Sequence, residues 1–169
     1  MSSWLFPTTA DVGMRVFASS LATLLQDAAY GMQTYLLSTK SANSIHSLVR
    51  HTGEWRIRAQ HQPRDPAYLF LAWLDEVLYR GEVHQQWLVD ATIRVDEEED
   101  GLEAVVQASW VNASQVEREI EIKAVTTHRL VVREVMREEV VSSEWEDVPA
   151  FEGPGWYADV VFDLSLIHI

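Results

Sequence analysis

The chain has 169 residues, of which 47% are hydrophobic, and its 26 acidic and 13 basic side chains give a formal net charge of −13. This length suits one domain with a full core, and the charge argues against broad binding to nucleic-acid phosphates. The lack of cysteine excludes disulfides, zinc–thiolate sites and thiol nucleophiles. Because there is neither an apolar run of the roughly 20 residues that a membrane span needs nor a secretory signal, we expect a cytoplasmic protein with no membrane partner.

Two short strands are expected near the N-terminus, at residues 4–6 and 14–17, because both runs are rich in aromatic and β-branched residues. Between them, Thr8 suits a turn, and Gly13 allows backbone angles that other residues resist. Asp11 therefore lies at a bend between strands. Its carboxylate can bond its own backbone or point into a site, and this segment alone leaves both alternatives open.

Two helices follow from the spacing of apolar residues. Residues 19–37 repeat apolar side chains at three- and four-residue steps, after a serine that can cap the first turn. An aspartate and a proline at residues 65–66 begin a second helix, which we expect to stop near Gly81. The polar segment Thr39–Ser44 is typical of a loop, and residues 54–61 alternate as a half-buried strand does.

The remainder of the chain is rich in strand patterns. Extended segments are predicted at residues 87–95, 102–110, 116–126, 129–136 and 156–163. An acidic turn at residues 96–101 joins the first two, and Glu138–Pro154 is predicted to be an exposed irregular loop. Two helices and six or seven mostly antiparallel strands indicate an α+β sandwich in one domain, with both helices on one face of the sheet.

Common catalytic motifs are missing from the sequence. It has no glycine-rich phosphate loop, nucleophile elbow or zinc-protease helix motif, and no two histidines have the spacing of a metal pair on one helix face. Lys123 and His128, near the end of a predicted strand, are unremarkable individually. Asp163 closes the last strand and supplies a second acid at a strand end.

Four segments taken together resemble the archease family in their order and spacing. They are Thr9-Ala10-Asp11-Val12-Gly13, Trp73-Leu74-Asp75-Glu76-Val77-Leu78-Tyr79, Ile122-Lys123-Ala124-Val125-Thr126-Thr127-His128 and Phe162-Asp163. The lysine-alanine-valine-threonine strand is the most specific of these motifs. The resemblance implies one archease-like domain over residues 1–163, a sandwich of two helices packed on a mostly antiparallel sheet.

The resemblance also implies a function. Archeases are non-catalytic protein cofactors of the RtcB-type RNA-splicing ligase, which joins a 2′,3′-cyclic or 3′-phosphate end to a 5′-hydroxyl using GTP and manganese. They promote guanylylation of the ligase and its multiple turnover in tRNA splicing and RNA repair. RNA would therefore be reached only indirectly, through the ligase.

A divalent-metal site is part of the same resemblance. The implied ligands are Asp11, Asp163 and the backbone carbonyl of Leu164. Hard oxygen ligands suit calcium, with manganese or magnesium as alternatives, and do not suit zinc. Lys123 and His128 are the residues that the resemblance suggests for activation of the ligase.

The sequence departs from the family pattern at three places. Thr8 stands where a histidine is usual, and Thr127 stands where a tyrosine is usual. Family members tend to end just after the terminal aspartate, whereas residues 164–169 continue and match one reading frame of a common sequencing adaptor. We therefore expect residues 164–169 to be a non-native tail.

Two other functions remain open. One is a metal- or small-molecule-binding domain of the same fold without an RNA ligase partner, which a neighbouring ligase gene would argue against. The other is a free-standing enzyme, which turnover without ligase would indicate. The enzyme is the weakest reading because no nucleophile–base pair is apparent, so we expect no catalysis.

Overall fold

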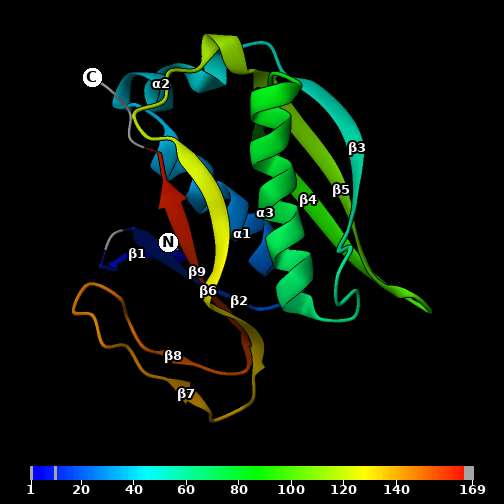
Figure 1. Ribbon diagram of the computed structural model, residues 1–169, viewed down its shortest axis with the longest axis vertical. Helices are drawn as coiled ribbons and strands as arrows, with labels where there is room; N and C mark the ends of the chain where they lie inside the picture. Colours follow the sequence, from blue (N-terminus) through cyan, green and yellow to red (C-terminus); the bar gives the residue numbers. More distant parts are fainter. Residues whose placement is uncertain (1, 10, 166–169) are drawn as a thin grey trace.

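The computed structural model describes residues 2–9 and 11–165, and it places two helices between two antiparallel sheets (Figure 1). The four-stranded sheet has the order β1 (Ser3–Pro7), β2 (Val12–Ala18), β9 (Gly155–Leu164), β6 (Ile122–Val135). The three-stranded sheet has the order β3 (His51–Arg58), β5 (Gly101–Asn112), β4 (Gln86–Glu98). The helices between them are α1 (Leu21–Leu36) and α3 (Pro66–Val83).

The predicted class of a single α+β domain with antiparallel sheets is confirmed, but the layering of the helices and the conformation of one polar segment differ from the prediction. The strands form two main sheets that enclose the helices, so the helices do not cover one face of a single sheet. The segment predicted as a loop is a short helix, α2 (Thr39–Ser44), followed by the 3-10 turn η1 (Ile45–Ser47). It forms because the Ser38 side chain caps its first turn by accepting a hydrogen bond from the backbone N–H of Ser41 at 3.1 Å.

Local caps set the starts of both long helices, as predicted. Ser20 Oγ accepts a hydrogen bond from the backbone N–H of Thr23 at 3.1 Å, and Asp65 Oδ1 accepts one from Ala67 at 2.9 Å. Helix α3 continues to Val83, past the predicted stop. Among the described residues, no helix is both long and apolar enough to cross a membrane.

Strand β6 differs most from the pattern expected in the sequence. Residues 122–135 form one continuous strand where two were predicted, and residues 116–121 precede it outside any strand. Its pairing with β9 shifts register twice, between Ile122 and Ala124 and between Thr126 and Val131. Bulges of this kind let a strand continue through residues that look like a break in the sequence. A short 3-10 turn, η2 (Ala113–Gln115), follows β5.

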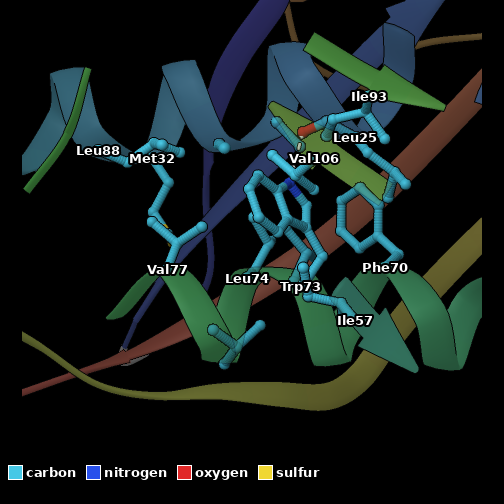
Figure 2. Close-up of a cluster of buried hydrophobic side chains, with 14 of the residues drawn as sticks. Leu25, Met32, Ile57, Phe70, Trp73, Leu74, Val77, Leu88, Ile93 and Val106 are labelled. Carbon is cyan, nitrogen blue, oxygen red and sulfur yellow. Dashed lines mark hydrogen bonds between the residues drawn. The ribbon is translucent and has the colours of Figure 1, made fainter. Parts of the chain in front are cut away.

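The main core lies between the two sheets and is centred on the contact of α1 with α3 (Figure 2). Trp73 of α3 is fully buried, and its indole N–H donates a hydrogen bond to the backbone carbonyl of Leu25 at 2.8 Å. Leu74 and Val77 of α3 are also buried beside α1. Packing of the second helix against the first is therefore confirmed.

The segment Glu138–Pro154 is mostly exposed and irregular, as predicted, but it also packs on the outer face of the four-stranded sheet, the face turned away from the helices. It contains the paired strands β7 (Val140–Val141) and β8 (Phe151–Glu152) and is called the lobe below. Trp145 stacks on Phe6 with a centroid distance of 4.2 Å, and Val148 is buried against Phe6 and Val161. The lobe therefore has a small apolar core of its own with this face.

A buried ion pair within the sheet also makes a hydrogen bond to the lobe. Arg15 of β2 binds Asp159 of β9 through two N–O contacts of 2.7 Å each, and its third nitrogen donates to the backbone carbonyl of Ser142 at 3.0 Å. The hydrogen bond with Asp159, opposed by burial, raises the pKa of Arg15 above its usual value. Because two-point arginine–carboxylate contacts are directional, this pair orients the lobe on its sheet.

Candidate metal centre

The two aspartates singled out in the sequence lie near the same end of the four-stranded sheet, Asp11 in the bend before β2 and Asp163 in β9. Strands β2 and β9 pair with Val12 opposite Phe162. Asp11 directly precedes Val12 and Asp163 directly follows Phe162, so continuation of this register places the two aspartates opposite each other. Directly opposite residues of antiparallel strands share a face and have Cβ atoms about 4.5–5.5 Å apart.

Both aspartates belong to the outer face of this sheet. Phe162 is buried in the main core, whereas Val161 packs against Phe6 on the outer side. Because side chains alternate along a strand, Asp163 shares the face of Val161. A Cβ atom at Gly13 would lie 2.1 Å from the ring of Phe6, so Gly13 also faces outward, and Asp11, two residues earlier, continues that face.

The glycine at position 13 has a different role from the predicted one. Its φ is outside the left-handed region, so it does not serve to reach unusual backbone angles. It leaves room for the ring of Phe6 to lie across β2. Close packing, and not turn geometry, therefore explains the glycine beside Asp11.

The turn before β2 leaves the carboxylate of Asp11 available. Thr8 Oγ1 accepts a hydrogen bond from the backbone N–H of Asp11 at 3.0 Å, so the threonine side chain closes this turn. Within residues 2–9 and 11–165, no hydrogen bond or ion pair from another residue reaches the carboxylate of Asp11 or Asp163. Like charges in opposite positions repel, and a bound cation would remove that cost. The donor chemistry therefore fits a hard divalent ion.

Leu164 is placed to contribute only its backbone. It pairs with Ile122 of β6, and its side chain packs against the main core. The next residue, Ser165, donates its backbone N–H to the carbonyl of Glu121 at 2.9 Å. From residue 166 onward, the expected non-native tail lies outside the described residues.

Lys123 and His128 reach the same end of the sheet from β6. Ala124 is opposite Asp163, and Lys123 lies exposed in the bulge immediately before that pair. His128 lies in the second bulge and borders a shallow depression. The residues lining this depression are Pro7, Thr8, Thr9, Asp11, His128, Arg129 and Val161.

A second acidic cluster lies on the other sheet. Asp96, Glu98 and Glu103 have carboxylate oxygens within 4.8 Å of one another. Glu103, however, binds Arg56 and Arg58 at 2.9 Å each. Asp96 likewise binds Arg94 at 2.8 Å. Because arginines already neutralise this cluster, the geometry favours the aspartate pair at the end of β2 and β9 as the cation site.

Sequence reasoning missed three residues on this face of the sheet. Arg15 and Asp159 could have been found, because each is a lone charge inside an apolar strand, and such charges are rarely buried unless paired. Arg129 gave no comparable signal. Its place in the depression depends on the bulge of β6 and on the folding of the lobe.

Comparisons with known proteins agree with this fold. Residues 4–164 match the model of the Archease protein family. The protein named "Protein archease" from Methanothermobacter thermautotrophicus is 28% identical over 128 residues, which are 75% of this chain and 85% of that protein. The solution structure of protein 1598 from Methanobacterium thermoautotrophicum superposes with a TM-score of 0.62 at 22% identity, covering 96% of this chain and 99% of that chain.

Proposed function

Because this chain belongs to the archease family, we propose that it activates an RtcB-type RNA ligase in the cytoplasm and catalyses no reaction itself. It would promote guanylylation of the ligase and its multiple turnover in tRNA splicing or RNA repair. The observation that carries this proposal is the match of residues 4–164 to the archease family model, and the β2–β9 register, which ends one residue short of Asp11 and Asp163, supports the metal-site part.

The two carboxylates and the carbonyl of Leu164 would hold a divalent cation, with calcium as the first choice and manganese or magnesium as alternatives. When bound, the cation supplies positive charge that attracts phosphate oxygens. β2 and β9 are the two central strands of their sheet; Asp163 lies in β9 and Asp11 directly precedes β2, so both would be held close to rigid elements. Lys123 and His128, at the same end, would contact the ligase or its nucleotide.

Charge complementarity supports a ligase as the partner. The chain carries a formal charge of −13, whereas a pocket that binds GTP and RNA needs positive charge. Attraction between the two surfaces would speed their encounter and make it sensitive to salt. RNA would be reached only indirectly, as a strand held by the ligase, because the acidic chain repels extended phosphate backbones.

The test is ligation of an RNA with a 2′,3′-cyclic phosphate end by the cognate ligase at limiting enzyme. The wild type should raise product above one turnover, and Asp163→Asn should lose this effect while keeping its melting temperature. Asp90→Asn, an exposed change of equal charge on the other sheet, should stimulate normally. Full stimulation by Asp163→Asn would overturn the metal-centred proposal. No stimulation by the wild type would favour a binding domain without a ligase partner.

A further inference from the structure

Part of the wall of the depression is built by an irregularity in β6. Within the bulge between Thr126 and Val131, Arg129 has a φ of 57°, in the left-handed region that L side chains rarely adopt. Bulges redirect side chains and are frequent beside functional sites, and strained residues cluster there too. Here the bulge brings His128 and Arg129 to the depression that Asp11 also lines.

The lobe holds the guanidinium of Arg129 in place. The Cζ atom of Arg129 lies 5.7 Å from the ring centroid of Trp145 and 5.9 Å from that of Phe6, and these two rings stack on each other. The guanidinium of Arg15 lies 5.3 Å from the same Trp145 ring. Trp145 is thus fixed by the buried ion pair of Arg15, and Arg129 rests on a fixed aromatic surface.

One contact of Arg129 competes with any anion. Its Nη2 donates to Glu144 Oε1 at 3.0 Å, and both side chains are about half exposed or more. Ion pairs of this exposure are weak and screened by salt. A doubly charged phosphoryl group can therefore displace Glu144, and removal of the Glu144 charge should favour the anion.

We propose that this depression binds a phosphoryl group, with Arg129 as its anchoring residue and His128 beside it. The planar guanidinium fork matches two phosphoryl oxygens, and a side chain that is already ordered loses less entropy on binding. This inference deepens the proposed function and rests on it, since a cation held by Asp11 and Asp163 would meet the same phosphoryl group. The ligand class is a phosphate monoester, carried by a nucleotide or by an RNA 3′ end.

The test is an NMR titration of the full ¹⁵N-labelled chain with inorganic phosphate in magnesium buffer, without ligase. Saturable shifts of the Arg129 Nε–Hε signal and of the amides around the depression are expected. Arg129→Gln should weaken phosphate binding at least about tenfold. Arg129→Lys should bind with intermediate affinity, because it keeps the positive charge but loses the planar guanidinium group. Glu144→Gln should strengthen phosphate binding about threefold, because it removes the competing carboxylate. Arg137→Gln, an exposed arginine just before the lobe, is the matched control and should change nothing.

Guanosine monophosphate and a 3′-phosphorylated dinucleotide, titrated in parallel, show whether the phosphoryl group comes from a nucleotide or from an RNA end. Equal phosphate affinity in wild type and in folded Arg129→Gln, or shifts spread over the whole surface, would overturn the site. That result together with loss of ligase stimulation in Asp163→Asn would leave the proposed function standing. Localised phosphate binding by a wild type that does not stimulate ligase would refute the proposed function alone.

Discussion

Asp11 and Asp163 come from opposite ends of the chain and extend the same pair of central strands, one residue beyond the pairing of Val12 with Phe162. The register of β2 with β9 fixes which residues can meet there. A slip of one residue would turn either aspartate toward the main core, where Phe162 now lies fully buried. The core therefore enforces the geometry of the candidate metal centre.

Removal of either carboxylate should weaken calcium binding. Asp11→Asn and Asp163→Asn should each raise the calcium Kd at least about tenfold, which corresponds to 1.4 kcal/mol. Calorimetric titration measures the Kd. The melting temperature of the wild type should also rise with calcium, because a ligand of the folded state stabilises it. Asp90→Asn is the charge-matched control, and unchanged calcium affinity in Asp11→Asn would remove Asp11 from the site.

Truncation in the core should cost far more stability than truncation at the surface. Leu74 is fully buried, so Leu74→Ala should lower the free energy of unfolding by about 2–5 kcal/mol. For a chain of this size that lowers the melting temperature by roughly 4–20 °C. Val49→Ala, at a side chain 73% exposed, should have little effect. Equal melting temperatures in thermal denaturation would contradict the packing of α3 against α1.

The features that were predicted correctly are those set by residues close together in the sequence. The starts of α1 and α3 were predictable because Ser20 and Asp65 cap the turns that follow them directly. The division of the strands into two sheets and the packing of Trp145 on Phe6 were not, because both depend on contacts between residues far apart in sequence. The packing of the lobe was not predicted either, because most of its residues are polar and its small apolar core comprises few residues.

An added methyl group at Gly13 should disturb the sheet beside the candidate metal centre. Its Cβ atom would overlap the ring of Phe6, so Gly13→Ala should destabilise the fold by about 1–3 kcal/mol despite its small size. Chemical denaturation measures this change. Phe6→Leu in the same chain should recover part of the loss, giving a coupling energy between the two positions. Strictly additive effects would mean that the ring does not constrain residue 13.

Acid should weaken one contact at the start of the lobe. The backbone N–H of Met136 and then Arg133 bind the Glu139 carboxylate and lower its pKa. A lowered folded pKa adds stability above the unfolded pKa, and that stability is lost as the pH falls through the folded pKa. Carbon-13 NMR titration should show Glu139 titrating below the ordinary glutamate value, and Arg133→Gln should raise its pKa. An unchanged pKa in Arg133→Gln would exclude the ion pair in solution.

The aspartates of the candidate metal centre were identified in the sequence, whereas the arginine beside them was not. Asp11 and Asp163 were singled out by family resemblance and by their positions at strand ends, and the β2–β9 pairing ends at Val12 and Phe162, the residues next to them. Arg129 was not predicted as a site residue, because a bulge, its positive φ and the distant Trp145 together determine where its guanidinium lies. The pairing with β9 that makes the bulge and the packing of Trp145 both depend on residues distant in the sequence.

Lys123 provides a test of how this end of the sheet meets the ligase. It is exposed in the bulge next to the Ala124–Asp163 pair, so Lys123→Ala should leave stability within about 0.5 kcal/mol of the wild type. If its ammonium group contacts the ligase or its nucleotide, stimulation of ligation should fall, and Lys123→Arg should restore it in part by keeping the charge. Lys40→Ala, at the exposed lysine of α2, is the matched control. Full stimulation by Lys123→Ala in the limiting-ligase assay would show that Lys123 is only a solvated strand residue.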